Sequence, residues 1–195
     1  MDEQNVRRVA VYCGSSSGND PAFTEAAVET GKELAKRGLE LVYGGGRVGL
    51  MGSVADAVLA EGGVVRGIIT TALLDAEVGH IGLTSLEVVG SMHDRKLRMA
   101  ELADAFLALP GGFGTWDELF EVITWTQLGI HSKPAAVLNT NGYWDGLLQQ
   151  TKHAAANGFM KETHAELLRS AAEPKEVVDL LLSPLPLPTP KWAKR

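Results

Sequence analysis

The sequence predicts a single α/β domain built as a Rossmann-like, doubly wound parallel sheet. The chain has 195 residues, and at about 150 residues per domain this length favours one domain. Short apolar runs alternate with longer stretches of helical periodicity, a pattern typical of α/β folds. The strand-like runs are continuously apolar, as expected when both faces of a parallel sheet are buried.

The expected strands and helices follow one another along the chain. Apolar runs of strand length occupy residues 8–13, 39–43, 64–69, 85–89, 105–109 and 134–138. Residues 21–37, 52–61, 91–103 and 115–128 are predicted as the connecting helices. In the first of these helices Phe23, Ala27, Thr30 and Leu34 recur at helical spacing, and Gly38 ends it. Residues 143–182 are predicted to be helical with a break near Asn157 and Gly158.

The domain is expected to cover residues 1–183, followed by a proline-rich tail over 184–195. A net charge of −6 argues against nucleic-acid binding, because phosphate neutralisation drives that association. A single cysteine, Cys13, excludes an internal disulfide and a cysteine-rich zinc site. No run approaches the ~18 apolar residues of a membrane span or forms a signal-peptide core, so we expect a cytoplasmic protein.

Glycine is unusually frequent and is placed at three strand-to-helix turns. It accounts for 22 of 195 residues, about 11%, against an average of about 7%. Gly/Ser-rich clusters occupy residues 13–18, 44–52 and 110–115. In a parallel sheet these turns meet at the carboxyl edge, where free helix N–H groups bind anions. A phosphate or nucleotide site is favoured over the alternative, in which the glycines serve tight-turn packing alone.

Two known nucleotide-binding motifs, the dinucleotide fingerprint and the Mg-ATP loop, are incomplete in this sequence. Gly44-x-Gly46-x-x-Gly49 matches the dinucleotide fingerprint, yet the next strand ends Ile68-Ile69-Thr70-Thr71 without the carboxylate that would hold a ribose. No Gly-Lys-Ser/Thr follows any of the three turns, so the Mg-ATP loop is absent too. The sequence therefore predicts phosphate binding without a nicotinamide, a flavin or Mg-ATP.

Charged residues cluster beside these turns. Arg95, Lys96 and Arg98 lie within four residues of a predicted helix, where they form either a phosphate grip or a solvated basic face. Asp117 and Glu118 lie in the first turn of another helix. Acidic residues there are either dipole partners, or carboxylates held ionised and suited to general-base catalysis. Glu121 follows one turn later, and Glu77, in a predicted loop, is a further candidate carboxylate.

Other candidate groups are weaker. The histidines show no metal-binding spacing, so no metal site is predicted. Cys13 is either a nucleophile or, more commonly for such a residue, a small buried side chain. Met51, Met92, Met99 and Trp125 are expected in the core, with one or two of them walling a base pocket.

The segment Pro110-Gly111-Gly112-Phe113-Gly114-Thr115-Trp116-Asp117-Glu118 resembles the PGGxGTxxE motif of the LOG ("Lonely Guy") family. That family comprises cytokinin riboside 5′-monophosphate phosphoribohydrolases. The resemblance is supported by residues 44–52, by Met92-His93-x-Arg95-Lys96 and by residues 124–134. It implies a Rossmann-like homodimer without a cofactor that hydrolyses AMP or N6-prenylated AMP to free base and ribose 5-phosphate. Nothing in the sequence supports lysine decarboxylation, a label some relatives have carried.

Carried onto matching positions, the resemblance implies that Arg95 and Glu118 are the catalytic pair. It implies that Gly112, Gly114 and Thr115 hold the phosphate together with Lys96, and that Glu77 contacts ribose. The whole predicted substrate site comprises Ser15, Gly45, Gly46, Glu77, Met92, Arg95, Lys96, Gly111, Gly112, Phe113, Gly114, Thr115, Trp116, Asp117 and Glu118. The alternative is a carrier that binds a nucleotide or molybdenum cofactor without turnover.

Overall fold

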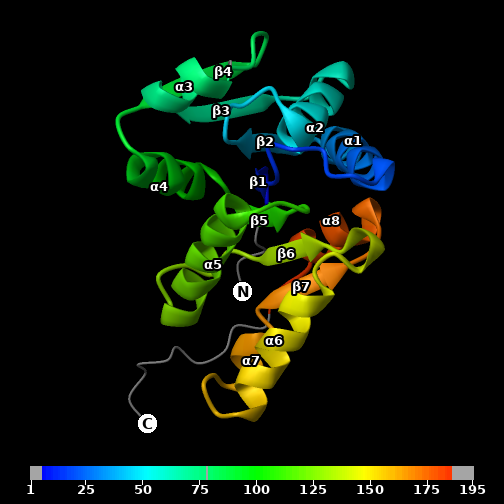
Figure 1. The fold of residues 1–195 in the computed structure, drawn as a ribbon, viewed down its shortest axis with the longest axis vertical. Coiled ribbons are helices and arrows are strands. Elements are labelled where there is room, and N and C mark those ends of the chain that lie inside the picture. The colour runs from blue at the N-terminus through cyan, green and yellow to red at the C-terminus, as the bar shows by residue number, and fades with distance from the viewer. Residues whose placement is uncertain (1–5, 78, 186–195) are drawn as a thin grey trace.

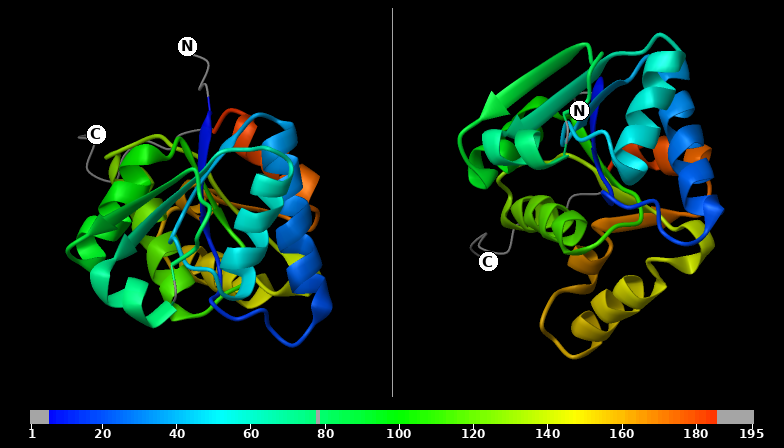
Figure 2. Two further views of the ribbon diagram at one scale, coloured as in Figure 1. Left: turned by 90° about the horizontal axis from the view of Figure 1, so that it is seen from above. Right: turned by 45° about the horizontal axis from the view of Figure 1, so that its top comes forward.

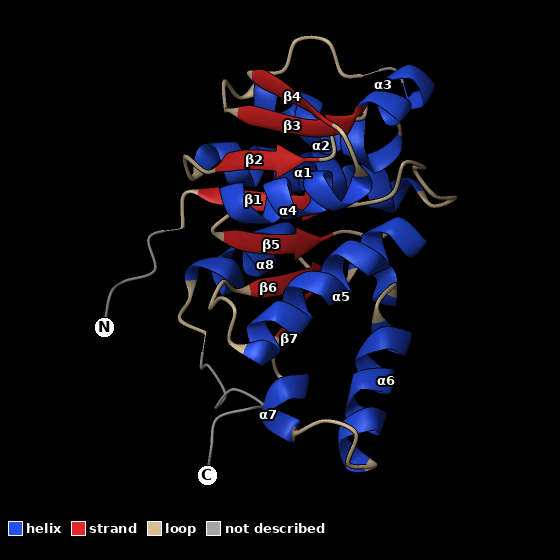
Figure 3. Ribbon diagram, turned by 90° about the vertical axis from the view of Figure 1, so that its left-hand side faces the viewer, coloured by secondary structure: helices blue, strands red, loops and turns tan. Residues whose placement is uncertain are grey.

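Seven parallel strands form one twisted sheet in the order β4-β3-β2-β1-β5-β6-β7. This computed structural model describes residues 6–77 and 79–185. The strands are β1 (Arg8–Tyr12), β2 (Glu40–Tyr43), β3 (Val65–Thr70), β4 (Ser85–Val89), β5 (Ala105–Ala108), β6 (Ala135–Leu138) and β7 (Leu168–Ala171). Figures 1 and 3 show them stacked side by side, with their carboxyl ends at one edge. The predicted parallel α/β fold is confirmed.

Helices cover both faces of the sheet. They are α1 (Pro21–Lys36), α2 (Gly49–Ala60), α3 (Thr71–Glu77), α4 (Met92–Leu102), α5 (Phe113–Leu128), α6 (Asp145–Ala156), α7 (Glu162–Ala165) and α8 (Pro174–Leu182), with a short 3₁₀ turn, η1 (Thr140–Gly142). Figure 2 shows α1, α2 and α8 on one face and α4 and α5 on the other. None of the helices within the described residues is long and apolar enough to cross a membrane.

The sheet divides the core into two apolar layers. In β1, for example, Val9 and Val11 face α1 and α8, whereas Ala10 and Tyr12 face α4 and α5. Alternate residues of a strand point to opposite faces, so both sets are buried only when helices cover both sides. The edge strand β4 is the exception, because four of its five residues are exposed.

Two sequence predictions about secondary structure are wrong. Residues 143–182 are not helical throughout, because β7 lies between α7 and α8 and pairs with β6. Four residues are too few to show a strand periodicity, and this strand depends on its pairing with β6. The segment after β3, predicted as a loop, forms α3. The predicted strand over residues 85–89 is confirmed as β4.

The direction of the strand order reverses at β1. This strand pairs with β2 on one side and with β5 on the other. The chain therefore leaves β1, β2 and β5 through three turns that open at the same edge, at the topological switch point where α/β folds bind ligands. The three glycine-rich clusters are these turns.

Candidate functional site

Backbone hydrogen bonds connect the three glycine-rich turns directly. The Gly14 N–H, after β1, donates to the Pro110 carbonyl after β5 at 3.0 Å. The Gly14 carbonyl accepts from the Leu50 N–H, at the start of α2, at 3.1 Å. Side chains of ordinary size would separate the turns, since a Cβ at Gly49 would lie 2.5 Å from the Ser15 carbonyl oxygen. Part of the glycine excess thus serves close packing of the turns.

A cleft of about 290 Å³ opens where these turns meet. It is lined by Cys13, Gly14, Ser15, Met51, Met92, Arg95, Gly112, Phe113, Gly114, Thr115, Asp117 and Glu118. These residues come from the ends of β1 and β5 and from α2, α4 and α5. The cleft therefore combines backbone N–H groups, one guanidinium and two carboxylates.

The first turn of α5 presents free N–H groups to this cleft. The first bond within the helix runs from the Trp116 N–H to the Gly112 carbonyl at 3.1 Å, so residues 113–115 have no donor role inside the helix. A Cβ at Gly112 or at Gly114 would meet no atom within 4 Å, unlike one at Gly111. Packing therefore does not explain these two glycines, whereas close approach of an anion to the helix N-terminus does.

Arg95 is held by two backbone carbonyls beneath the cleft. Its Nε donates to the Ile68 carbonyl at 3.0 Å and its Nη2 to the Gly44 carbonyl at 3.1 Å. The residue is only 7% exposed. A Cβ at Gly44 would lie 1.9 Å from Nη2, so glycine at this position makes room for the guanidinium. The remaining nitrogen, Nη1, lies 3.5 Å from Glu118 Oε1.

The carboxyl group of Glu118 is largely buried in the cleft. Its side chain is 12% exposed. Burial raises the pKa of Glu118 from 4.5 to about 7, although the Arg95 guanidinium opposes this rise. The raised pKa means that Glu118 ionises only near neutral pH, later than an ordinary carboxyl group would. A carboxyl group with a pKa near neutrality is suited to exchange a proton with a reactant.

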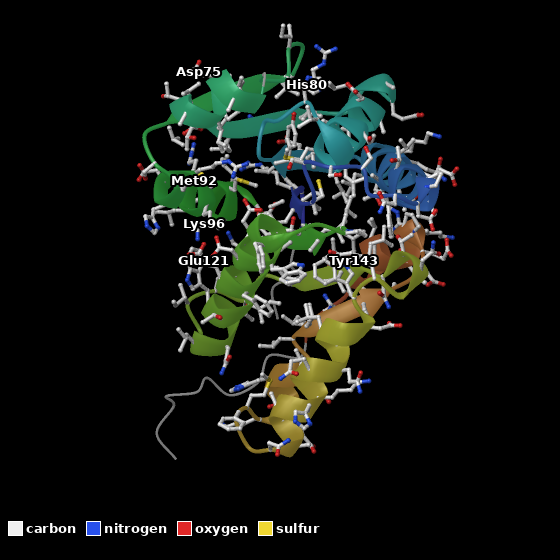
Figure 4. All side chains as sticks on the ribbon, in the orientation of Figure 1. Asp75, His80, Met92, Lys96, Glu121 and Tyr143 are labelled. Carbon is white, nitrogen blue, oxygen red and sulfur yellow. The ribbon has the colours of Figure 1, made fainter. Side chains whose placement is uncertain are left out.

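Lys96 contacts acids beside the cleft. Its ammonium lies 3.0 Å from Asp117 Oδ2 and 3.4 Å from Glu121 Oε1, and it is not among the residues that line the cleft. Figure 4 shows Lys96 and Glu121 on the neighbouring helices α4 and α5. The Nε of Arg98 instead forms an ion pair with Glu87 Oε1, in the edge strand β4, at 3.0 Å. Of the basic cluster, only Arg95 lines the cleft.

Four other predicted site residues, Gly45, Gly46, Gly111 and Trp116, are not among the residues that line the cleft. Gly111 borders an adjoining hollow, and Trp116 packs edge-on against Phe113. Gly45 and Gly46 belong to the buried turn after β2, where the Gly45 carbonyl accepts from the His80 N–H at 3.1 Å. The side chain of Glu77 lies outside the described residues, so its predicted ribose contact stays a prediction.

The cleft also contains residues that the predicted site omitted. Met51 lines its wall, as do Cys13 and Gly14 at the end of β1. Burial raises the pKa of the Cys13 thiol, which disfavours a thiolate nucleophile. For Cys13 and Gly14, the position directly after β1 at the carboxyl edge was the available signal, whereas Met51 of α2 is one of the residues expected in the core or in the wall of a base pocket. Within residues 6–77 and 79–185, no three His, Cys, Asp or Glu side chains are grouped to hold a metal ion.

Comparison with known proteins identifies the family. Residues 51–181 match a family model described as "Possible lysine decarboxylase". The chain is 49% identical over 187 residues to the probable cytokinin riboside 5′-monophosphate phosphoribohydrolase LOGL9 of Oryza sativa subsp. japonica, covering 96% of this chain and 82% of the relative. It is 45% identical to LOG1 of Arabidopsis thaliana, covering 92% and 84%. The chain belongs to the LOG family.

Solved structures agree on the fold of this LOG family member. The molybdenum cofactor binding protein of Rippkaea orientalis superposes with a TM-score of 0.69 at 20% identity, covering 90% of this chain and 95% of that one. The molybdenum cofactor carrier protein of Chlamydomonas reinhardtii gives a TM-score of 0.66 at 19% identity, covering 91% and 99%. At this identity the likeness concerns the fold alone.

In the turn after β5, Gly111 is closely packed and Gly114 faces open space, so substitution should change stability differently at the two positions. In Gly111→Ala the new Cβ would lie 2.8 Å from the Gly14 nitrogen, so the free energy of unfolding should fall by about 1–3 kcal/mol. In Gly114→Ala the Cβ has open space, so stability should be unchanged or slightly raised by the better helix former. Urea denaturation of both variants measures the difference, and equal losses would contradict the packing argument.

The buried carboxyl group predicts a pH-dependent gain from Glu118→Gln. The raised pKa means that the native state binds this proton more tightly than the unfolded chain, so ionisation destabilises the fold between pH 4.5 and about 7. The amide resembles the protonated acid. At pH 8 the variant should be more stable by ~2–3 kcal/mol, and by much less at pH 5.

Thermal unfolding of both proteins at the two pH values measures this effect. The melting temperature should differ by about 4–10 °C at pH 8. Glu25→Gln, on the exposed side of α1, is the control for loss of a carboxylate. An equal gain at both pH values would contradict the assignment.

Proposed function

We propose that this protein hydrolyses the N-glycosidic bond of an adenosine 5′-monophosphate, including N6-modified forms, and releases the free base and ribose 5-phosphate. The observation that carries the proposal is the buried Glu118 carboxyl group, 3.5 Å from Arg95 and in the same cleft as the free N-terminus of α5. The curated relatives bear names for this reaction on cytokinin riboside 5′-monophosphates.

The phosphate binds at the first turn of α5. The N–H groups of residues 113–115 are free of helical partners, and the helix dipole adds partial positive charge there. Thr115 adds a hydroxyl at the same turn. Because the phosphate is remote from the reacting carbon, its binding energy orients the ribose over Glu118.

Glu118 acts one helical turn further along α5. As the bond between C1′ and the base breaks, positive charge develops on the ribose, as it does in glycoside hydrolysis. The ionised carboxylate stabilises that charge and orients a water molecule. The water oxygen bonds to C1′ as the bond from C1′ to the base nitrogen breaks, and the water proton passes to Glu118. The departing base nitrogen takes up a proton from solvent, and Glu118 afterwards returns its proton to solvent.

Arg95 supports the ionised state of this acid. Its guanidinium lowers the pKa of Glu118, which burial alone would raise further. Two backbone carbonyls fix the guanidinium, so it holds its place as the carboxyl group gains and loses a proton. We propose Arg95 and Glu118 as the catalytic pair, with Lys96 orienting Asp117 and Glu121 beside them.

The second candidate is a carrier that binds a nucleotide or molybdenum cofactor without turnover. Two structural neighbours bear such names, but they share only the fold with this chain, at 19–20% identity. A carrier has no need for a buried carboxyl group with a pKa near 7. Release of free adenine from AMP, followed by chromatography, separates the two functions.

Glu118→Gln should lower kcat for AMP at least ~100-fold and leave AMP affinity nearly unchanged, because the amide neither accepts a proton nor stabilises a cation. Glu25→Gln, at an exposed carboxylate of α1 outside the cleft, is the control and should retain the wild-type turnover. Adenine release and calorimetric binding of AMP measure both quantities. Near-normal turnover in Glu118→Gln would defeat the catalytic assignment.

The rate of AMP hydrolysis should also depend on pH. For the wild-type protein kcat/KM should rise as Glu118 ionises and level off above about pH 7. The substrate phosphate itself titrates near pH 6, so inhibition by ribose 5-phosphate over the same range serves as the reference.

We also propose that the protein works as a homodimer in the cytoplasm, where a single free cysteine stays reduced. Leu119 and Val122 of α5 face the sheet, whereas Phe113, Trp116 and Phe120 form an exposed stripe at helical spacing. Large apolar side chains grouped in this way favour association with a second chain.

Phe120→Glu should dissociate this dimer, because it places a charge within the apolar stripe. Light scattering coupled to gel filtration should then give the mass of one chain, 20.8 kDa, in place of two. Phe159→Glu, at an 85% exposed residue after α6, should keep the mass of the wild-type protein. A wild-type protein that elutes as a single chain would refute the dimer.

A further inference from the structure

Tyr143 reaches the phosphate-binding turn from a distant part of the chain. It follows η1, and its hydroxyl donates to the carbonyl of Gly111, 32 residues earlier. Its ring packs edge-on against Phe23 of α1, with centroids 5.9 Å apart, and against Trp144 at 5.1 Å. In Figure 4 Tyr143 lies where the chain passes from β5 into α5.

We infer that Tyr143 is a positioning residue whose hydroxyl fixes the peptide between Gly111 and Gly112, so that the Gly112 N–H faces the substrate phosphate. This inference deepens the proposed function and rests on it for the identity of the anion. The geometry of one peptide plane supplies the reason. In a trans peptide the carbonyl of one residue and the N–H of the next point in opposite directions.

The two directions correspond to two different hollows. Tyr143 and Gly111 line a hollow of about 360 Å³ on the side of α1, formed with Gly14 and Ser15. Gly112 lines this hollow and also the cleft that contains Arg95 and Glu118. Because the Gly111 carbonyl points to the Tyr143 side, the Gly112 N–H points away from it, toward the cleft.

A constraint on this peptide is needed because both of its residues are glycines. Without side chains, rotation of the peptide plane meets little steric resistance. The neighbouring carbonyls have backbone partners, Pro110 with the Gly14 N–H and Gly112 with the Trp116 N–H. Among the described residues, the Tyr143 hydroxyl is the one side chain that hydrogen-bonds a carbonyl of residues 110–112. A rotated peptide would turn a carbonyl oxygen toward the phosphate and replace attraction by repulsion.

Tyr143 itself is held in place by its surroundings. The next residue, Trp144, is 2% exposed, and its N–H donates to Asn139 Oδ1 at 2.7 Å. Asn141 Nδ2 donates to Asp20 Oδ2, at the start of α1, at 2.9 Å. Tyr143 therefore connects the Gly111–Gly112 peptide to α1 and to the segment after β6, and these contacts limit the rotation of that peptide.

Tyr143→Phe tests the inference, because it removes the hydroxyl and keeps the ring contacts with Phe23 and Trp144. Because the Gly112 N–H would no longer be fixed toward a charged ligand, KM for AMP should rise about 10-fold, with kcat within twofold of wild type. The dissociation constant of inorganic phosphate should rise by a similar factor. Tyr43→Phe, which removes a buried tyrosine hydroxyl that has no hydrogen-bond partner among the described residues, should leave both constants nearly unchanged.

The readouts separate this inference from the proposed function. Phosphate binding is measured by calorimetry and does not depend on hydrolysis, so weaker phosphate binding in Tyr143→Phe supports the inference even if AMP is not cleaved. Unchanged phosphate binding in a variant with wild-type melting temperature overturns it, whether or not AMP is hydrolysed. A fall in kcat with unchanged KM also overturns it, because the effect would then not act through the phosphate.

Discussion

The site depends on the backbone of Gly14, which connects all three glycine-rich turns. Its N–H donates to the turn after β5 and its carbonyl accepts from the turn after β2. Parallel strands bring the turns to one edge, but they do not set the distance between them. These two hydrogen bonds do so, and Gly49 and Gly111 permit the approach because a side chain at either would collide with the neighbouring turn. The cleft is consequently lined by turns whose backbones are hydrogen-bonded to one another.

Arg95 is the basic side chain among the residues that line the cleft, in a protein with a net charge of −6. The carbonyls of Ile68 in β3 and of Gly44 directly after β2 accept hydrogen bonds from two of its nitrogens, so the guanidinium is fixed before it meets Glu118. A buried cation without partners would be costly, and carbonyl oxygens lower that cost without neutralising the charge. Arg95 therefore retains the capacity to stabilise an ionised Glu118, while burial keeps the carboxyl group close to its protonated form.

Much of the fold could be predicted from the sequence, because its strands are apolar on both faces and its turns are marked by glycine. The meeting of the glycine-rich turns at one edge, where the cleft opens, could be predicted for the same reason. Features that depend on tertiary contacts could not be predicted from the sequence. The strand β7 exists through its pairing with β6, and Lys96 is engaged by Asp117 and Glu121 across two helices. The hydrogen bond from Tyr143 to Gly111 joins segments with no shared local pattern, and the balance of burial against charge at Glu118 has no signature in a single sequence.

Glu118 is the feature of this cleft that favours catalysis over binding alone. Backbone N–H groups at the start of a helix bind any suitable anion, and structures at 19–20% identity with the same architecture carry names that refer to a bound cofactor. An anion site gains nothing from a carboxylate placed in the same cleft, because like charges repel each other and the buried acid lowers stability at neutral pH. A sugar that develops positive charge beside the phosphate gives that carboxylate a function. The unfavourable placement of Glu118 is therefore the strongest structural argument that this cleft carries out chemistry.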